Sequence, residues 1–163
     1  MHNGTQSDPS DGTSGITEAE MRLFKARRAF ERWLVVSISK AGGGDLTSTE
    51  ALIFLTIARS GGITAANIRI ALSFEHAHTV SHAVKKLDAA GLIVAGQNSG
   101  AKRLHASARG NEVFESYLKL WTSFVADAVN DGQPAHTPQP SKPGSLDCLS
   151  GLYLQATQAV AAL

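Results

Sequence analysis

The chain has 163 residues, of which 43% are hydrophobic and 18% are charged, and its formal net charge is +1. This composition is that of a globular protein, and it excludes both a disordered chain and a protein that coats nucleic acid through overall positive charge. A single cysteine, Cys148, excludes an intrachain disulfide, and no apolar run approaches the roughly 18 residues of a membrane span. Because residues 1–15 also lack the basic-then-apolar pattern of a secretory signal, we expect a cytoplasmic protein of one domain, with no membrane partner.

The N-terminal part of the chain predicts a disordered tail followed by a long helix. Residues 1–15 are rich in Ser, Gly, Asp and Thr and contribute little to a core. Thr17 and Glu20 have the spacing of a capping box, which predicts a helix from there to about Lys40. We interpret the basic side chains of this helix as a solvated face, with phosphate contact as the less favoured alternative. They belong to Arg22, Lys25, Arg27, Arg28 and Arg32.

The next helix is predicted to lie at the centre of the core. Thr47 and Glu50 form a second capping box, and the helix continues to about Ser60. Leucine, isoleucine and phenylalanine side chains nearly surround it, and a helix of that kind belongs inside a domain. Gly61 and Gly62 end it.

Residues 64–107 carry the pattern that indicates the fold. Thr64 is a suitable cap for a short helix, and a second helix follows over about residues 75–90, where Gly91 ends it. Residues 92–107 then predict two short strands joined by an Asn-Ser-Gly turn. Two helices followed by a hairpin predict a mostly α fold with a small β-hairpin wing, a winged helix-turn-helix.

The second helix of this segment has one apolar face and one polar face. Its predicted inward residues are Ala77, Val80, Val84 and Leu87. We expect the polar face to enter the DNA major groove and the hairpin to reach phosphates or the minor groove. His78 and His82 are the candidates for base selectivity, since imidazoles donate to and accept from base edges. The candidate DNA-binding residues are His76, His78, Thr79, Ser81, His82, Lys85, Lys86, Lys102 and Arg103.

The C-terminal part predicts two more helices joined by a loop. Ser107 caps a helix that continues to about Asn130, with an apolar stripe too wide for a small winged domain to cover alone. A terminal apolar helix beyond a proline-rich loop has little reason to be stable alone, so we expect it to pack across a dimer partner. The predicted units are a disordered tail at 1–15, a winged domain with flanking helices at 16–130, a proline-rich loop at 131–145 and a dimerisation helix at 146–163.

Four segments together carry a family resemblance. Residues 46–50, 62–64, 79–93 and 106–110 resemble the MarR family of bacterial repressors, and the resemblance extends over about residues 17–130. It implies a homodimeric winged-helix transcription factor that binds double-stranded DNA, most often as a repressor. The wing keeps a basic pair, whereas the aspartate that the family usually carries there is absent.

The same resemblance implies a small-molecule effector. Proteins that resemble this family often bind a small aromatic acid between the dimer helices and the winged lobe. Aromatic side chains at helical spacing are more often plain core, which stays the favoured interpretation. The candidate effector-binding residues are Phe30, Trp33, Phe54, Tyr117 and Trp121.

A metal site finds less support in the sequence. His78 and His82 share one helix face, with His76 nearby, which is a spacing that zinc uses. The helix offers only Glu75 as a further ligand, and the single cysteine lies far along the chain. We therefore interpret the histidines as polar side chains that face the groove, and we predict no metal and no cofactor.

Catalysis is also disfavoured, and one other class of function stays open. Cys148 lies among apolar residues and is typical of a buried thiol, and Gly42–Gly44 lacks the flanking strand and lysine of a phosphate loop. We predict no enzyme. The alternative to a DNA-binding regulator is a winged-helix module for protein contacts, which an absence of salt-dependent DNA binding would favour.

Overall fold

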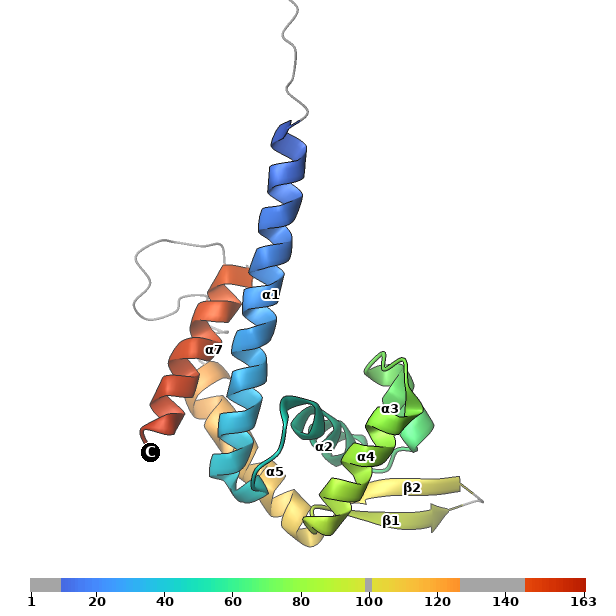
Figure 1. Cartoon of the computed structure of the whole chain (residues 1–163). Coiled ribbons are helices and arrows are strands. Elements are labelled where there is room, and N and C mark those ends of the chain that lie inside the picture. The colour runs from blue at the N-terminus through green and yellow to red at the C-terminus, as the bar shows by residue number, and fades with distance from the viewer. Residues whose placement is uncertain (1–9, 99–100, 127–145) are drawn as a thin grey trace, which may run out of the picture.

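The computed structural model describes residues 10–98, 101–126 and 146–163. It is mostly helical and contains a two-stranded antiparallel hairpin, which confirms the predicted fold class of a winged helix-turn-helix. Figure 1 shows two long helices, α1 and α7, that extend away from the winged lobe, and we call this pair the arm. Within the described ranges, no helix combines the length and apolarity that crossing a membrane requires.

Helix α1 spans Ser10–Ile38 and continues into a π-helical turn, η1, at Ser39–Gly43. It therefore begins before the predicted cap at Thr17, and the prediction of a helix start there was wrong. The capping-box spacing is present, but the backbone is already helical at that point. Of the predicted tail, residues 10–15 belong to this helix and residues 1–9 lie outside the described residues.

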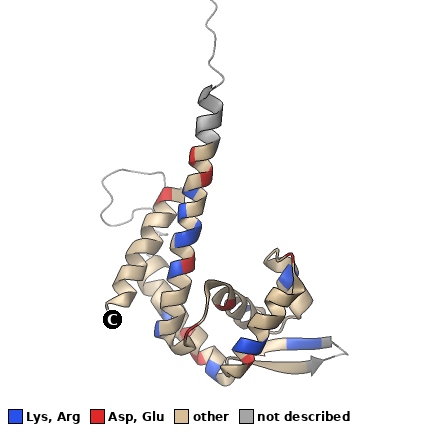
Figure 2. Ribbon diagram, in the orientation of Figure 1, with Lys and Arg blue, Asp and Glu red and all other residues tan. Residues whose placement is uncertain are grey.

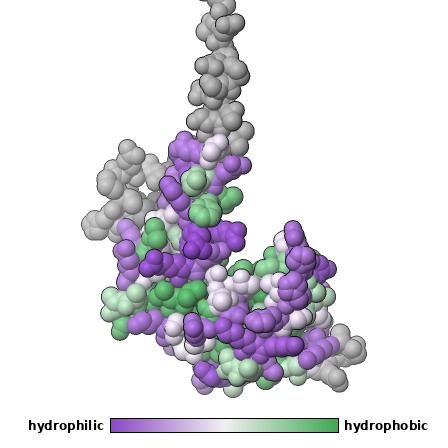
Figure 3. All heavy atoms as spheres, viewed as in Figure 1, coloured by the Kyte–Doolittle hydropathy of each residue, from purple (hydrophilic) through white to green (hydrophobic). Residues whose placement is uncertain are grey.

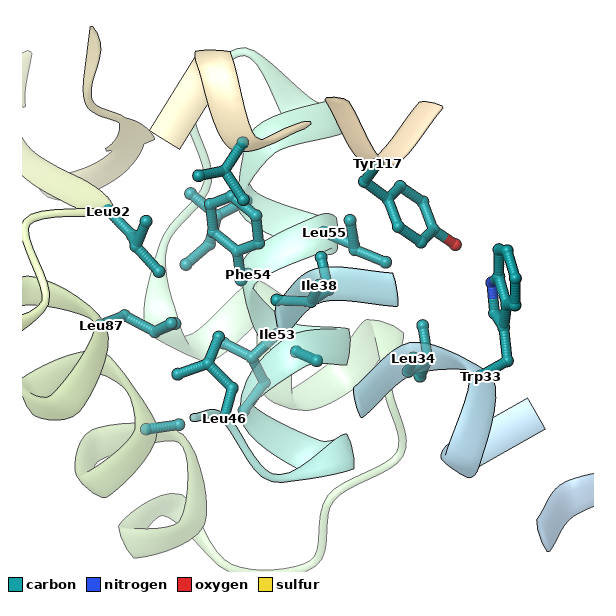
Figure 4. Packing of buried hydrophobic residues seen from close by; sticks show 14 of the residues in the cluster. Trp33, Leu34, Ile38, Leu46, Ile53, Phe54, Leu55, Leu87, Leu92 and Tyr117 are labelled. Carbon is teal, nitrogen blue, oxygen red and sulfur yellow. The ribbon is translucent and has the colours of Figure 1, made fainter. Parts of the chain in front are cut away.

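Helix α2 (Ser48–Ser60) begins at the capping box that the sequence predicts. The Thr47 side chain accepts a hydrogen bond from the Glu50 amide, and the Glu50 carboxylate accepts one from the Thr47 amide. Ile53, Phe54 and Ile57 are fully buried, which confirms the central position of this helix. In Figure 4 the side chains of α2 lie between leucines of the winged lobe and aromatic residues of α1 and α5.

Helices α3 (Ala65–Ala71) and α4 (Ala77–Ala89) form the helix-turn-helix. The Thr64 hydroxyl caps α3 by accepting a hydrogen bond from the Asn67 amide. The buried face of α4 consists of Val80, Ala83 and Leu87. The prediction placed Ala77 in this face, but Ala77 is exposed because the first turn of α4 extends beyond the core.

Gly91 ends the second helix as predicted, with a backbone φ of +67° that a side chain would disfavour. Strands β1 (Ile93–Asn98) and β2 (Ala101–Ala106) then pair in antiparallel register. At the base of the hairpin, Ile63 and Leu104 exchange two backbone hydrogen bonds, of 3.0 and 2.8 Å. The wing is thus fastened to the segment between α2 and α3. We call residues 63–106 the reading head.

Helix α5 (Ala108–Trp121) is capped by Ser107 as predicted and continues as a π-helical turn, η2, at Thr122–Ala126. The rest of that predicted helix and the proline-rich stretch fall within residues 127–145, outside the described residues.

Helix α7 (Leu146–Ala161) packs against α1 of its own chain. Its Tyr153 ring lies 5.3 Å from Phe30 and 6.3 Å from Trp33, measured between ring centroids. The surface on which this helix packs within its own chain is supplied by α1. The expectation that it packs across a dimer partner stays a prediction.

Candidate nucleic-acid interface

The reading helix, α4, presents its polar face to solvent. Its buried residues fix the rotation of the helix, so that His78, Ser81, His82 and Lys85 are exposed on the other side. Thr79 is half-buried at the edge of this face. The structure thus brings together most of the candidate residues that the sequence places on this helix. Figure 3 shows a largely hydrophilic surface over the reading head.

The start of α4 carries a pair of stacked imidazoles. His76 occupies the N-cap position with an extended backbone, and its side chain makes no capping hydrogen bond. Its ring stacks on that of His78, with centroids 5.3 Å apart and planes inclined by 17°. The His76 side chain is 68% exposed, and its Nε2 lies 3.9 Å from the Glu75 carboxylate. The two imidazoles therefore stand at the solvent-facing N-terminus of the helix, where the helix dipole favours an anion.

Lys86 has a partner that the sequence does not reveal. Its ammonium donates a 2.8 Å hydrogen bond to Glu50, whose side chain is only 7% exposed. Burial would raise the pKa of Glu50, but the hydrogen bonds from Lys86 and Thr47 outweigh it and hold the pKa below its ordinary value. Lys86 thus fastens the reading helix to α2 and is less available to phosphates than its neighbour Lys85. The sequence indicated Glu50 only as a capping residue, and no pattern of neighbouring residues indicated that it pairs with Lys86.

The basic pair of the wing is divided between the two faces of the hairpin. Lys102 and Arg103 are both exposed, but successive side chains of a strand point to opposite faces. Arg103 donates a 2.9 Å hydrogen bond to the carbonyl of Gly62. His105, on the Arg103 face, packs against Gly62 so closely that a Cβ there would overlap its imidazole. Lys102 is therefore the freer of the two cations.

Two further residues hold the C-terminal end of the reading helix. The Ser107 hydroxyl donates a 2.6 Å hydrogen bond to the Gly91 carbonyl, in addition to capping α5. The Arg109 guanidinium donates to the carbonyls of Ala90, at 2.8 Å, and Gly42, at 3.3 Å. Sequence reasoning missed these roles. The only available signal was the position of Ser107 and Arg109 in a segment that carries the family resemblance.

Positive charge lies on two parts of the molecule. Figure 2 shows lysine and arginine on α4 and β2, and also along α1, where acidic residues lie among them. Among the described residues, no three His, Cys, Asp or Glu side chains are grouped so that they could hold a metal ion. The exposed cations and imidazoles of α4 and the wing are groups of the kind that contact phosphates and base edges in other proteins.

The aromatic residues proposed for an effector fall into two groups. Phe30, Tyr117 and Trp121 line a cavity of about 870 Å³ between α1, α2, α5 and α7. Trp33 and Phe54 do not line it, and both are fully buried core residues, as Figure 4 shows. The other lining residues include Leu52, Leu55, Thr56, Arg59, Ser60, Phe114, Leu118 and Tyr153. Among the described residues that line the cavity, Arg59 is the only one with a charged side chain.

The chain's similarity to known proteins lies in its fold. A scan against models of protein families and a search of curated proteins found no match. A search of solved structures found the activation domain of the phage T4 transcription factor MotA, at 23% identity and TM-score 0.48, covering 60% of this chain and 98% of that one. It also found a multiple antibiotic-resistance repressor (MarR) from Listeria monocytogenes, at 17% identity and TM-score 0.49, covering 78% of this chain and 90% of that one. The assignment of a winged helix-turn-helix rests on the elements and strand register of this chain itself.

Proposed function

We propose that this protein is a sequence-specific, DNA-binding transcriptional regulator that works as a homodimer and acts as a repressor. The observation that carries the proposal is the exposed polar face of α4, with His78, Ser81 and His82, beside a wing that carries exposed cations. A helix of this kind fits the major groove, and an adjacent hairpin reaches the sugar-phosphate backbone. Repression is proposed because residues 46–50, 62–64, 79–93 and 106–110 resemble a family of repressors.

The candidate contacts divide by position along α4. A helix in the major groove presents its N-terminal part to the bases, so His78, Ser81 and His82 are the residues for selectivity. Lys85 lies a turn further on and neutralises phosphate. Because Lys86 is fastened to Glu50, we assign it a positioning role in place of a direct contact. In the wing, Lys102 is the principal phosphate contact.

The test is selection of bound sequences from a random duplex library, followed by binding measurements at several salt concentrations. A dimer doubles every contact, so we expect a near-palindrome with half-sites about one helical turn apart. His82→Ala is expected to relax preference at symmetric positions, by roughly 1–3 kcal/mol of discrimination. Gln158→Ala, an exposed position on α7, is the matched control. An absence of salt-dependent DNA binding would exclude the proposal and favour the protein-contact module.

The aromatic cavity supports an effector as part of this proposal. Its lining is apolar and aromatic around one guanidinium, which suits a planar aromatic anion. The cavity borders α2, whose first turn holds the reading helix through Glu50 and Lys86, so a ligand that shifts α2 would shift the reading helix. Quenching of Trp121 fluorescence by a panel of aromatic carboxylates tests this. Arg59→Met is expected to weaken binding of the anions and to leave neutral analogues unaffected.

A further inference from the structure

Three histidines lie on the solvent-facing side of α4. His76 is the N-cap residue, His78 belongs to the first turn, and His82 follows one turn later on the same face as His78. All three side chains are exposed. The rings of His76 and His78 stack, with their centroids 5.3 Å apart and their planes inclined by 17°. We call these two residues the imidazole pair.

The imidazole pair consists of the residue type whose charge ordinarily changes between pH 5 and pH 8. The His76 Nε2 lies 3.9 Å from the Glu75 carboxylate, and this contact is an ion pair only when the ring is protonated. The two side chains are 68% and 89% exposed, so solvent screens the attraction between them. The rings are therefore open to solvent and to any acceptor that approaches α4.

The other charged groups around α4 are of types that do not ordinarily titrate near neutral pH. Helix α4 packs against α2, α3 and β1, and β1 contains no charged residue. The charged residues on the two helices and on α4 itself are Glu50, Arg59, Arg69, Lys85, Lys86 and Asp88. Carboxylates, lysines and arginines ordinarily keep their charge between pH 6 and pH 8. A change in the charge of this surface over that range therefore comes from histidine.

Stacking limits the imidazole pair to one positive charge. A protonated ring can lie over the face of a neutral ring, which is a favourable arrangement of a cation and an aromatic face. Protons on both rings would place two like charges 5.3 Å apart, which costs free energy. The pair is therefore suited to sharing a single proton.

A duplex bound to α4 would bring negative charge to the imidazole pair. Duplex DNA carries one phosphate charge per roughly 1.7 Å of its axis. A protonated imidazole neutralises a phosphate or donates to a guanine acceptor, whereas a neutral imidazole carries no charge. The complex with DNA then holds the proton more tightly than the free protein does. Because linkage is reciprocal, a fall in pH then strengthens the binding of DNA.

We propose that the imidazole pair makes DNA binding sensitive to pH, with tighter binding when the pair holds a proton. The inference rests on the proposed function, because it concerns the regulation of the same helix. For each α4 on the duplex, affinity should rise by about tenfold between pH 8 and pH 6, the value of one charge-assisted hydrogen bond. The slope of log affinity against log salt should also become steeper, by up to about 0.9 for each phosphate neutralised.

The test compares the affinity of the full-length protein at pH 6 with that at pH 8, at equal ionic strength. The probe is a duplex selected from the random library at pH 7. A variant that combines His76→Gln and His78→Gln keeps polar side chains without titratable rings, so its affinities at the two pH values should be nearly equal. His82→Gln and His105→Gln are the matched controls, and each should keep the wild-type ratio. Circular dichroism at both pH values checks the fold of every variant.

The outcomes separate this inference from the proposed function. A wild type that binds the duplex equally at pH 6 and pH 8 overturns the inference alone, and so does a double variant that keeps the wild-type ratio. A protein that binds no duplex at either pH overturns both.

Calorimetry in two buffers of different ionisation enthalpy counts the protons taken up on binding. The wild type should take up more protons than the double variant, by at most about one for each α4, because the stacked rings share one charge. A difference near two protons would contradict the shared proton.

Discussion

The reading head and the arm expose their surfaces for different reasons. In the reading head, short helices are held by caps and by a few buried residues, and α4 exposes a mostly polar face, while Ile70 of α3 is an apolar side chain that is 68% exposed. In the arm, a long helix is buried over its second half and exposes apolar side chains over its first half. The two regions thus differ in what they expose, which is mostly polar side chains on α4 and apolar side chains on the part of α1 that precedes its buried residues.

The largest expected effect lies in the arm. Replacing a side chain by alanine should lower the stability of the protein strongly in the buried part of α1 and only slightly in its exposed part. Trp33 is fully buried against Tyr117 and Tyr153, so Trp33→Ala should lower the free energy of unfolding by about 3–5 kcal/mol. Leu23→Ala, at a 58% exposed position of the same helix, should stay within about 0.5 kcal/mol. Urea denaturation at one protein concentration measures both. Equal losses would remove the distinction between the buried and exposed halves of α1.

The same comparison shows where sequence reasoning succeeds. The caps at Thr47, Thr64 and Ser107 and the stop at Gly91 were predicted correctly, because each depends on groups within a few residues of one another. The start of α1 was not, because the helix begins before the capping-box spacing at Thr17. The packing of α7 on α1 was not indicated either, because it joins segments far apart in the chain. Periodicity reports that a face is apolar, but it does not report which neighbour covers it.

The residues of the candidate site also divide into those that local spacing predicts and those whose contacts lie far along the chain. The exposed residues of α4 were predicted from the spacing of its buried face, which is local information. The fastening of Lys86 to Glu50 joins residues 36 positions apart, and the sequence shows each only as an ordinary charged residue. The same holds for Arg109, whose two acceptors belong to other elements.

The second prediction addresses the junction between the core and the reading helix. Glu50→Gln keeps an oxygen that can accept from Thr47 but removes the charge that faces Lys86, so we expect a loss of about 1–3 kcal/mol at neutral pH. Because the folded pKa of Glu50 lies below the ordinary 4.5, this stabilisation is present above pH 4.5 and is lost as the pH falls through the folded value. The unfolding curves of the two proteins should therefore converge in acid. A difference in unfolding free energy between the two proteins that persisted in acid would indicate a cause other than the charge.

The smallest effect separates the two neighbouring lysines of α4. Lys85→Ala should lower the slope of log affinity against log salt by up to about 0.9, the value for one phosphate contact, and leave stability unchanged. Lys86→Ala should instead destabilise the protein, with little change in slope, since its ammonium is held by Glu50. Titrations over several salt concentrations and thermal unfolding measure the two quantities. Identical behaviour of both variants would contradict the division of roles.

Arg109 has a consequence for the geometry of any assembly that joins two arms. Its guanidinium bridges the end of α4 and the turn that ends α1, and so connects the reading head to the arm. Because the arm is long, a small rotation at its junction with the reading head gives a large displacement at its far end. In the proposed homodimer, we expect the two hydrogen bonds of Arg109 to limit this rotation, and so to influence the span between half-sites that the dimer tolerates.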